Sequence, residues 1–148
     1  MKEKYEYNRN NDLRIYQGPR SRFTEFTFAL SVFFQFIKGF RSLHFQGPCI
    51  SIFGSARFEE DNEYYHQARE MGARVAKAGF NVVTGGGPGV MEAASRGAKE
   101  AGGHTIGVNI ELPFEQKPNP FLDLWVDIKY FFVRKVLLFK YSVGFVIM

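Results

Sequence analysis

A cluster of glycines separates an apolar run from an alanine-rich segment in the stretch FNVVTGGGPGVMEAASRGAKEAGG, residues 80–103. Glycines between a strand and a helix let the backbone approach a ligand closely, and the free N–H groups at the start of the helix attract an anion. The chemistry that this arrangement predicts is the binding of a phosphate or a sugar. The alternative is a purely structural role, in which the glycines serve a tight turn and close helix packing.

The spacing of these glycines differs from both common nucleotide-binding fingerprints. A P-loop ends in Gly-Lys-Ser/Thr, whereas Gly89 is followed here by valine and methionine. The dinucleotide fingerprint needs glycine at the first, third and sixth positions, but counting from Gly85 or Gly87 places Val90 or Glu92 at the sixth. A dinucleotide-dependent oxidoreductase is therefore disfavoured.

Three charged residues are candidates for contact with the ligand. Glu92 falls in the first helical turn, where the dipole favours a carboxylate that would itself repel a phosphate, so we expect it to face ribose hydroxyls or to cap its own loop. Arg134 lies in an almost wholly apolar helical segment, and a buried guanidinium needs an anionic or strongly polar partner. We expect Arg134 to face the ligand, with extension to the surface as the alternative. The flexible Lys135 is a weaker candidate, for which solvent is the favoured direction.

Alternating strands and helices must bring these residues together. Strands are predicted within residues 49–57, 80–84, 104–110, 124–128 and 143–148, and helices within 62–79, 90–101 and 130–141. This alternation predicts an α/β fold, a Rossmann-like three-layer domain with a central parallel sheet. Ligands of such sheets bind beyond the carboxyl ends of the strands, an edge that here collects Gly54, Ser55, the glycine loop and Asn109.

The first 46 residues precede this domain, which we assign to residues 47–148. Residues 1–22 are polar and basic and are expected to form a flexible arm, and residues 23–46 an amphipathic helix. One apolar stripe recurs along that helix at helical spacing: Phe23, Phe26, Leu30, Phe33, Ile37 and Phe40. Such a stripe needs a cover, which is either the helix's own domain or a second subunit.

The composition limits the number of domains, the class of ligand and the cellular compartment that we expect. The 148 residues suit one domain, and the net charge of +4 is spread through both halves, which fits a phosphorylated small molecule as well as nucleic acid. Cys49 is the sole cysteine, so neither an intrachain disulfide nor a cysteine-based zinc site is possible, and a reducing cytoplasm is expected. Charged and polar residues interrupt the aromatic segment near residue 30, so no membrane span is expected.

Three blocks carry a resemblance to a known family: FGSAR at residues 53–57, VVTGGGPGVMEAASRGA at 82–98 and FFVRKVLLFKYSVGFVIM at 131–148. Over roughly residues 45–148 the chain resembles the Lonely Guy (LOG) family, Rossmann-like phosphoribohydrolases once labelled lysine decarboxylases. The resemblance implies cleavage of a nucleoside 5′-monophosphate, AMP or a cytokinin riboside 5′-monophosphate, into free base and ribose 5-phosphate. It further implies a homo-oligomer that uses no metal or cofactor, without a nucleic-acid or membrane partner.

The same resemblance implies the site residues. The family's first signature, Gly-Gly-Gly-x-Gly-x-Met, is matched by Gly85, Gly86, Gly87, Gly89 and Met91. Arg134 matches the family's active-site arginine and is the expected catalytic residue. The second signature, Pro-Gly-Gly-x-Gly-Thr-x-x-Glu, supplies the catalytic glutamate of relatives and is not present in these 148 residues. We therefore expect hydrolysis from a full-length form and little from this chain alone. The alternatives are a non-catalytic nucleotide-binding or carrier module and an interaction protein built around the stripe.

Overall fold

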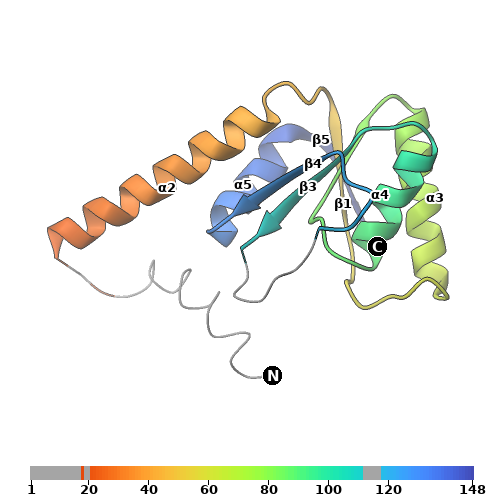
Figure 1. Ribbon diagram of the computed structural model, residues 1–148, viewed down its shortest axis with the longest axis horizontal. Coiled ribbons are helices and arrows are strands. Elements are labelled where there is room, and N and C mark those ends of the chain that lie inside the picture. Colours follow the sequence, from red (N-terminus) through yellow and green to blue (C-terminus); the bar gives the residue numbers. More distant parts are fainter. Residues whose placement is uncertain (1–17, 19–20, 112–117) are drawn as a thin grey trace.

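The computed structural model describes residue 18 and residues 21–111 and 118–148, which form an α/β fold (Figure 1). Its helices are α2 (Arg22–Leu43), α3 (Glu63–Lys77), α4 (Val90–Glu100) and α5 (Phe131–Tyr141). Its strands are β1 (Cys49–Phe53), β2 (Asn81–Thr84), β3 (Thr105–Ile110), β4 (Leu124–Ile128) and β5 (Ser142–Ile147). Of the predicted arm at residues 1–22, all but residues 18, 21 and 22 lies outside the described residues.

The five strands form one parallel sheet in the order β4-β3-β2-β1-β5. Its register pairs Ile50 with Val82 and Val83 with Ile106. Because β2, β3 and β4 lie on one side of β1 and β5 lies on the other, the strand order reverses between β1 and β5. Open α/β sheets bind ligands at such a reversal, beyond the carboxyl ends of the strands. The predicted Rossmann-like fold is confirmed.

Helices cover both faces of the sheet, α3 and α4 on one and α2 and α5 on the other (Figure 1). Two hydrophobic clusters follow from this arrangement, one containing Ile52, Val82 and the alanines of α4, the other Val83, Ile106 and the apolar side of α5. Helices α3 and α4 pack closely through glycines, because a Cβ on Gly97 would run into the backbone of Arg69. None of the helices in the described part of the chain is long and apolar enough to cross a bilayer.

Helix α2 packs on the domain through a face other than the predicted stripe. Ser21 caps it by accepting a hydrogen bond from the Thr24 amide (3.3 Å). The residues that contact the core are Phe28, Val32, Phe36, Phe40 and Leu43. Of the predicted stripe only Phe40 belongs to this set, and the other five side chains are between 37% and 77% exposed. The described part of the domain therefore leaves the stripe largely uncovered.

Candidate functional site

The glycine loop joins β2 to α4 at the carboxyl edge of the sheet, and buried hydroxyls hold it in place. Thr84 Oγ1 accepts a hydrogen bond from the Gly86 amide (3.1 Å) and lies 3.3 Å from Ser95 Oγ. Ser95 Oγ in turn donates to the Met91 carbonyl (2.9 Å), and both hydroxyl residues are at most 1% exposed. The loop conformation is thus tied to the start of α4 before any ligand arrives.

Gly89 brings this loop against the loop that follows β1. Its φ of 70° and ψ of −132° are unfavourable for a residue with a side chain, and a Cβ there would meet the Ser55 carbonyl and lie 2.8 Å from the carbonyl carbon of Ala56. The Val90 amide donates to that Ser55 carbonyl (3.0 Å). Gly54 is equally close, because a Cβ on it would overlap the Val90 side chain. Gly54 and Ser55 therefore lie beside the glycine loop, as predicted from the strand ends.

The amino end of α4 carries no side-chain cap, since its N-cap residue is Gly89 and no capping hydrogen bond from a described side chain is present. The first turn of a helix leaves backbone N–H groups without intrahelical partners, and they carry the positive end of the dipole. The hydroxyl of Ser55 does not reach them, because it accepts a hydrogen bond from the Arg57 amide (3.2 Å) within its own turn. The Val90 amide already donates to the Ser55 carbonyl, so this end of α4 offers an anion the amides that follow it, in the same turn as the Glu92 carboxylate.

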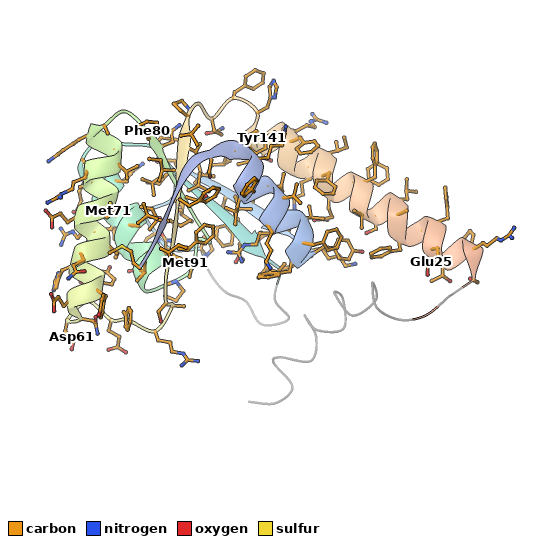
Figure 2. All side chains as sticks on the ribbon, turned by 180° about the vertical axis from the view of Figure 1, so that it is seen from behind. Glu25, Asp61, Met71, Phe80, Met91 and Tyr141 are labelled. Atoms are coloured by element: carbon orange, nitrogen blue, oxygen red, sulfur yellow. The ribbon has the colours of Figure 1, made fainter. Side chains whose placement is uncertain are left out.

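Arg134 reaches the glycine loop from the opposite face of the sheet. Its Nε donates to the Val108 carbonyl of β3 (2.8 Å), and its Nη2 lies so close to Gly85 that a Cβ on that glycine would collide with it. The Met91 sulfur approaches the same point from α4, 2.6 Å from where the Cβ would be. The structure thus brings Arg134, Met91 and Gly85 together. The same methionine lies beside Gly87, and Figure 2 shows it at the start of α4.

The guanidinium of Arg134 is half-buried, and this burial lowers its pKa. Among the described residues no carboxylate forms an ion pair with it. A cation removed from water without a counter-ion is costly, because the interior solvates charge poorly. A ligand anion beside Gly85 would offset that cost.

Two of the predicted ligand contacts are directed elsewhere. Glu92 accepts a hydrogen bond from the Tyr65 hydroxyl of α3 (3.3 Å), so it neither caps α4 nor contacts Arg134. Tyr65 is 2% exposed, and burial raises its pKa, which keeps the hydroxyl protonated as a donor. Lys135 is exposed, with its ammonium group 4.7 Å from the centre of the Phe131 ring. In this structure Glu92 thus links α4 to α3 and Lys135 lies at the surface, and their contacts with a ligand stay predictions.

Asn119, a residue not predicted from the sequence, forms two hydrogen bonds with the glycine loop. Its main-chain N–H donates to the Gly86 carbonyl (3.0 Å), and its side-chain Nδ2 donates to the Gly87 carbonyl (3.3 Å). The side chain is 6% exposed, and its Oδ1 accepts from the Phe121 amide (3.2 Å). An asparagine between two prolines is typical of a turn, but that pattern carries no information about a contact with residues 86 and 87.

Two further residues missed from the sequence, Trp125 and Asp127, lie on β4 beside Asn109 of β3, which was predicted at this edge. The Trp125 ring packs against Gly86 and leaves no space for a Cβ there. Its Nε1 donates to Asp127 (2.7 Å), and the other carboxylate oxygen of Asp127 accepts from Asn109 (3.1 Å). The carboxylate of Asp127 is therefore held by two donors and does not pair with Arg134.

The fold and this edge define a class of protein: a Rossmann-like α/β protein with a glycine-rich loop and a half-buried arginine where the strands end. The profile of the SLOG cluster4 family matches residues 48–147, more than half of the chain. The chain belongs to the SLOG cluster4 family, and the resemblance to LOG-type proteins is confirmed at the level of this superfamily.

Several solved structures share the fold of this chain. The protein TM1055 is 28% identical with a TM-score of 0.58, over 68% of this chain and 60% of that one. The molybdenum cofactor carrier protein of Chlamydomonas reinhardtii is 31% identical with a TM-score of 0.57, over 68% and 61%. The molybdenum cofactor binding protein of the phototrophic bacterium Rippkaea orientalis is 27% identical with a TM-score of 0.56, over 70% and 63%. The chain thus spans about three fifths of the length of these proteins. No curated protein matches it.

Proposed function

We propose that this chain binds a small phosphate-bearing heterocyclic ligand at the carboxyl edge of its sheet and acts as a binding or carrier protein. The observation that carries the proposal is the Arg134 guanidinium, which lies half-buried beside Gly85 and pairs with no carboxylate among the described residues. A nucleoside 5′-monophosphate and the molybdenum cofactor named for two relatives both combine a phosphate group with a nitrogen heterocycle in one small molecule.

Recognition would combine two sources of positive potential. The uncapped amino end of α4 offers backbone N–H groups, and Arg134 offers the N–H groups that are not used by the Val108 carbonyl. That bond to Val108 also orients the guanidinium plane, so less side-chain entropy is lost when the ligand binds. Hydrogen bonds between two charged groups in a partly buried site are roughly twice as strong as those between neutral groups. The phosphate is therefore expected to dominate affinity.

Isothermal titration calorimetry with AMP, ribose 5-phosphate and adenosine tests the phosphate requirement. AMP and ribose 5-phosphate should bind, and adenosine should bind at least about tenfold more weakly, because a hydrogen bond to a charged group contributes about 1.5–3 kcal/mol. The variant Arg134→Gln should lose affinity for AMP by a similar factor. The matched control Lys135→Gln, one residue along α5, should retain it. Equal losses in the two variants, or equal binding of adenosine and AMP, would contradict the proposal.

Competition separates the two ligand classes. If the natural ligand is the molybdenum cofactor, protein loaded with it, measured by molybdenum content, should retain the metal when AMP is added in excess. If it is a nucleoside monophosphate, AMP should displace the cofactor or prevent loading. Loading should fail in Arg134→Gln in either case, since both ligands would use the same guanidinium.

Hydrolysis of the N-glycosidic bond is a second candidate. By the resemblance to the LOG family Arg134 would be the active-site arginine, and its position beside Gly85 of the first signature supports this candidate. Glycoside cleavage also needs a carboxylate to stabilise an oxocarbenium-like state or to activate water. Glu92 accepts one hydrogen bond from Tyr65, Asp127 accepts from Trp125 and Asn109, and neither forms an ion pair with Arg134. We rank binding first on this ground, and release of adenine from AMP above the level of Arg134→Gln, measured chromatographically, would favour hydrolysis.

A further inference from the structure

Helix α2 carries two apolar faces on opposite sides, and the domain covers one of them. The inner face packs against α5 and the sheet. The outer face consists of Phe23, Phe26, Leu30, Phe33, Phe34 and Ile37, with exposed fractions of 77%, 64%, 42%, 55%, 59% and 37%. Figures 1 and 2 show the amino-terminal half of α2, which begins near Glu25, extending away from the sheet and its other helices.

The apolar residues of the outer face are spaced so that they lie along one side of α2. Phe23, Phe26, Leu30, Phe33 and Ile37 follow one another at alternating intervals of three and four residues. Intervals of three and four residues place these side chains on one side of the helix and make a continuous apolar face. A second helix with the same face has a matching shape, because side chains of one helix can insert between those of the other.

We propose that the outer face of α2 docks on α2 of a second copy of this chain. At about 200 Å² for a large apolar side chain, the exposed fractions leave roughly 650 Å² of apolar area on this face, at the upper end of what a monomer exposes in one patch. Two such faces together expose about 1,300 Å² of apolar area, enough to supply an interface at the lower end of the range for specific complexes. A self-complementary seam with two-fold symmetry would use the same residues on both copies.

The charges near the seam permit this pairing. Glu25, the acidic residue of α2, lies on the inner side with Lys129 and Tyr130. Arg22 and Arg41 lie at the two ends of the helix, so neither interrupts the apolar seam. Basic ends beside an aromatic face are also a feature of helices that lie on anionic membranes, and the experiment must separate the two occupants.

The first test is the mass of the full chain in solution, by size-exclusion chromatography with light scattering. We expect an assembly of at least two 17.0 kDa chains that falls to the single-chain mass in Phe26→Glu/Phe33→Glu. The control Phe45→Glu, at an 87% exposed phenylalanine just beyond α2, should keep the assembly. A wild-type chain of single mass, or an assembly that survives Phe26→Glu/Phe33→Glu with an unchanged circular dichroism spectrum, would overturn the proposal.

Cross-linking tests the same contact without a disruptive charge. Leu30 is at the middle of the seam, so it lies near its counterpart whether the helices run parallel or antiparallel. Under mild oxidation Leu30→Cys should form a covalent dimer, while Tyr64→Cys, an exposed position on α3, should not, and the native Cys49 is buried. Failure of Leu30→Cys to cross-link would overturn the proposal. A second result would also overturn it: the wild type, as a single chain, binds anionic vesicles and Phe26→Glu/Phe33→Glu does not. The outer face would then bind lipid and not a second copy.

Discussion

Replacing Gly89 by alanine is the sharpest test of how the two loops at the sheet edge fit together. A Cβ at this position would run into the backbone of Ser55 and Ala56, which cannot move aside as a flexible side chain does. The φ of 70° is in addition unfavourable for any residue with a side chain. Two other glycines serve as controls, because Gly79 and Gly102 have φ values of 86° and 79° but nothing within 4 Å of an added Cβ.

The expected loss of stability in Gly89→Ala has two parts: the strain of a positive φ and the overlap of the added Cβ with the neighbouring loop. Positive φ alone costs an alanine about 1–2 kcal/mol, part of which is offset by the smaller entropy of the unfolded chain. Overpacking against fixed atoms adds about 1–3 kcal/mol. We therefore expect Gly89→Ala to lower the free energy of unfolding by about 3 kcal/mol and Gly79→Ala by about 1 kcal/mol. At about 3 °C per kcal/mol for a chain of this size, the melting temperatures should fall by about 10 °C and about 3 °C.

Thermal unfolding followed by circular dichroism at the helix band measures these differences. The variants Gly79→Ala and Gly102→Ala should melt close together, and Gly89→Ala well below both. If all three variants melted at the same temperature, the collision with the loop after β1 would not exist, and the placement of Gly89 beside Ser55 would be refuted.

Three further predictions concern single side chains. Burial raises the pKa of the Cys49 thiol, so iodoacetamide at mildly alkaline pH should leave it unmodified in the folded protein and alkylate it in denaturant, as read by mass spectrometry. Burial alone would raise the pKa of Asp123, but hydrogen bonds from Lys99 and Thr105 outweigh burial and lower the pKa. Asp123→Asn should therefore lower the free energy of unfolding at neutral pH. The difference from wild type, measured by chemical denaturation, should shrink as the pH falls below about 4. Asn119→Ala should weaken ligand binding about fivefold in calorimetry while lowering the melting temperature by only a few degrees, because a hydrogen bond to the glycine loop is worth about 1 kcal/mol.

The elements of the sheet could be predicted because their signals are local. The run NVVT is followed by glycine and the run LWVDI lies between loops, and both form strands within a residue of the predicted bounds. Gly79, the last residue of the helix predicted within residues 62–79, adopts a positive φ just after α3. Parallel order then follows from the alternation of strands and helices, since the right-handed crossover leaves few other topologies.

The packing of α2 could not be predicted from its pattern because the helix is apolar on two sides. Periodicity identified the stripe that contains Phe26 and Phe33, whereas the domain covers the face that contains Val32 and Phe36. Which face packs depends on the surface offered by α5 and β4, and that surface is absent from a pattern read along one helix. The assignment of residues 23–46 as a separate unit stays a prediction.

The glycine loop was predicted together with Gly54, Ser55 and Arg134 beside it, but Asn119 and Trp125 were not, for a related reason. Glycine spacing is a backbone signal, whereas these two partners of the loop come from residues about thirty to forty positions away in sequence. The direction of Glu92 was equally inaccessible, because the rotation of α4 that places Met91 under the glycines turns Glu92 toward Tyr65. The ligand contacts of these residues stay predictions.

The presence or absence of a carboxylate near the ligand's anomeric carbon would decide whether this sheet edge only binds a nucleotide or also cleaves it. A guanidinium beside a glycine loop can hold a phosphate whether or not a reaction follows, whereas cleavage of a glycosidic bond requires a carboxylate within reach of the anomeric carbon. Glu92 accepts a hydrogen bond from Tyr65, Asp127 accepts from Trp125 and Asn109, and neither carboxylate pairs with Arg134. Under the binding proposal AMP should therefore be recovered intact after incubation with the protein, whereas release of free adenine would show that a carboxylate does act at this edge.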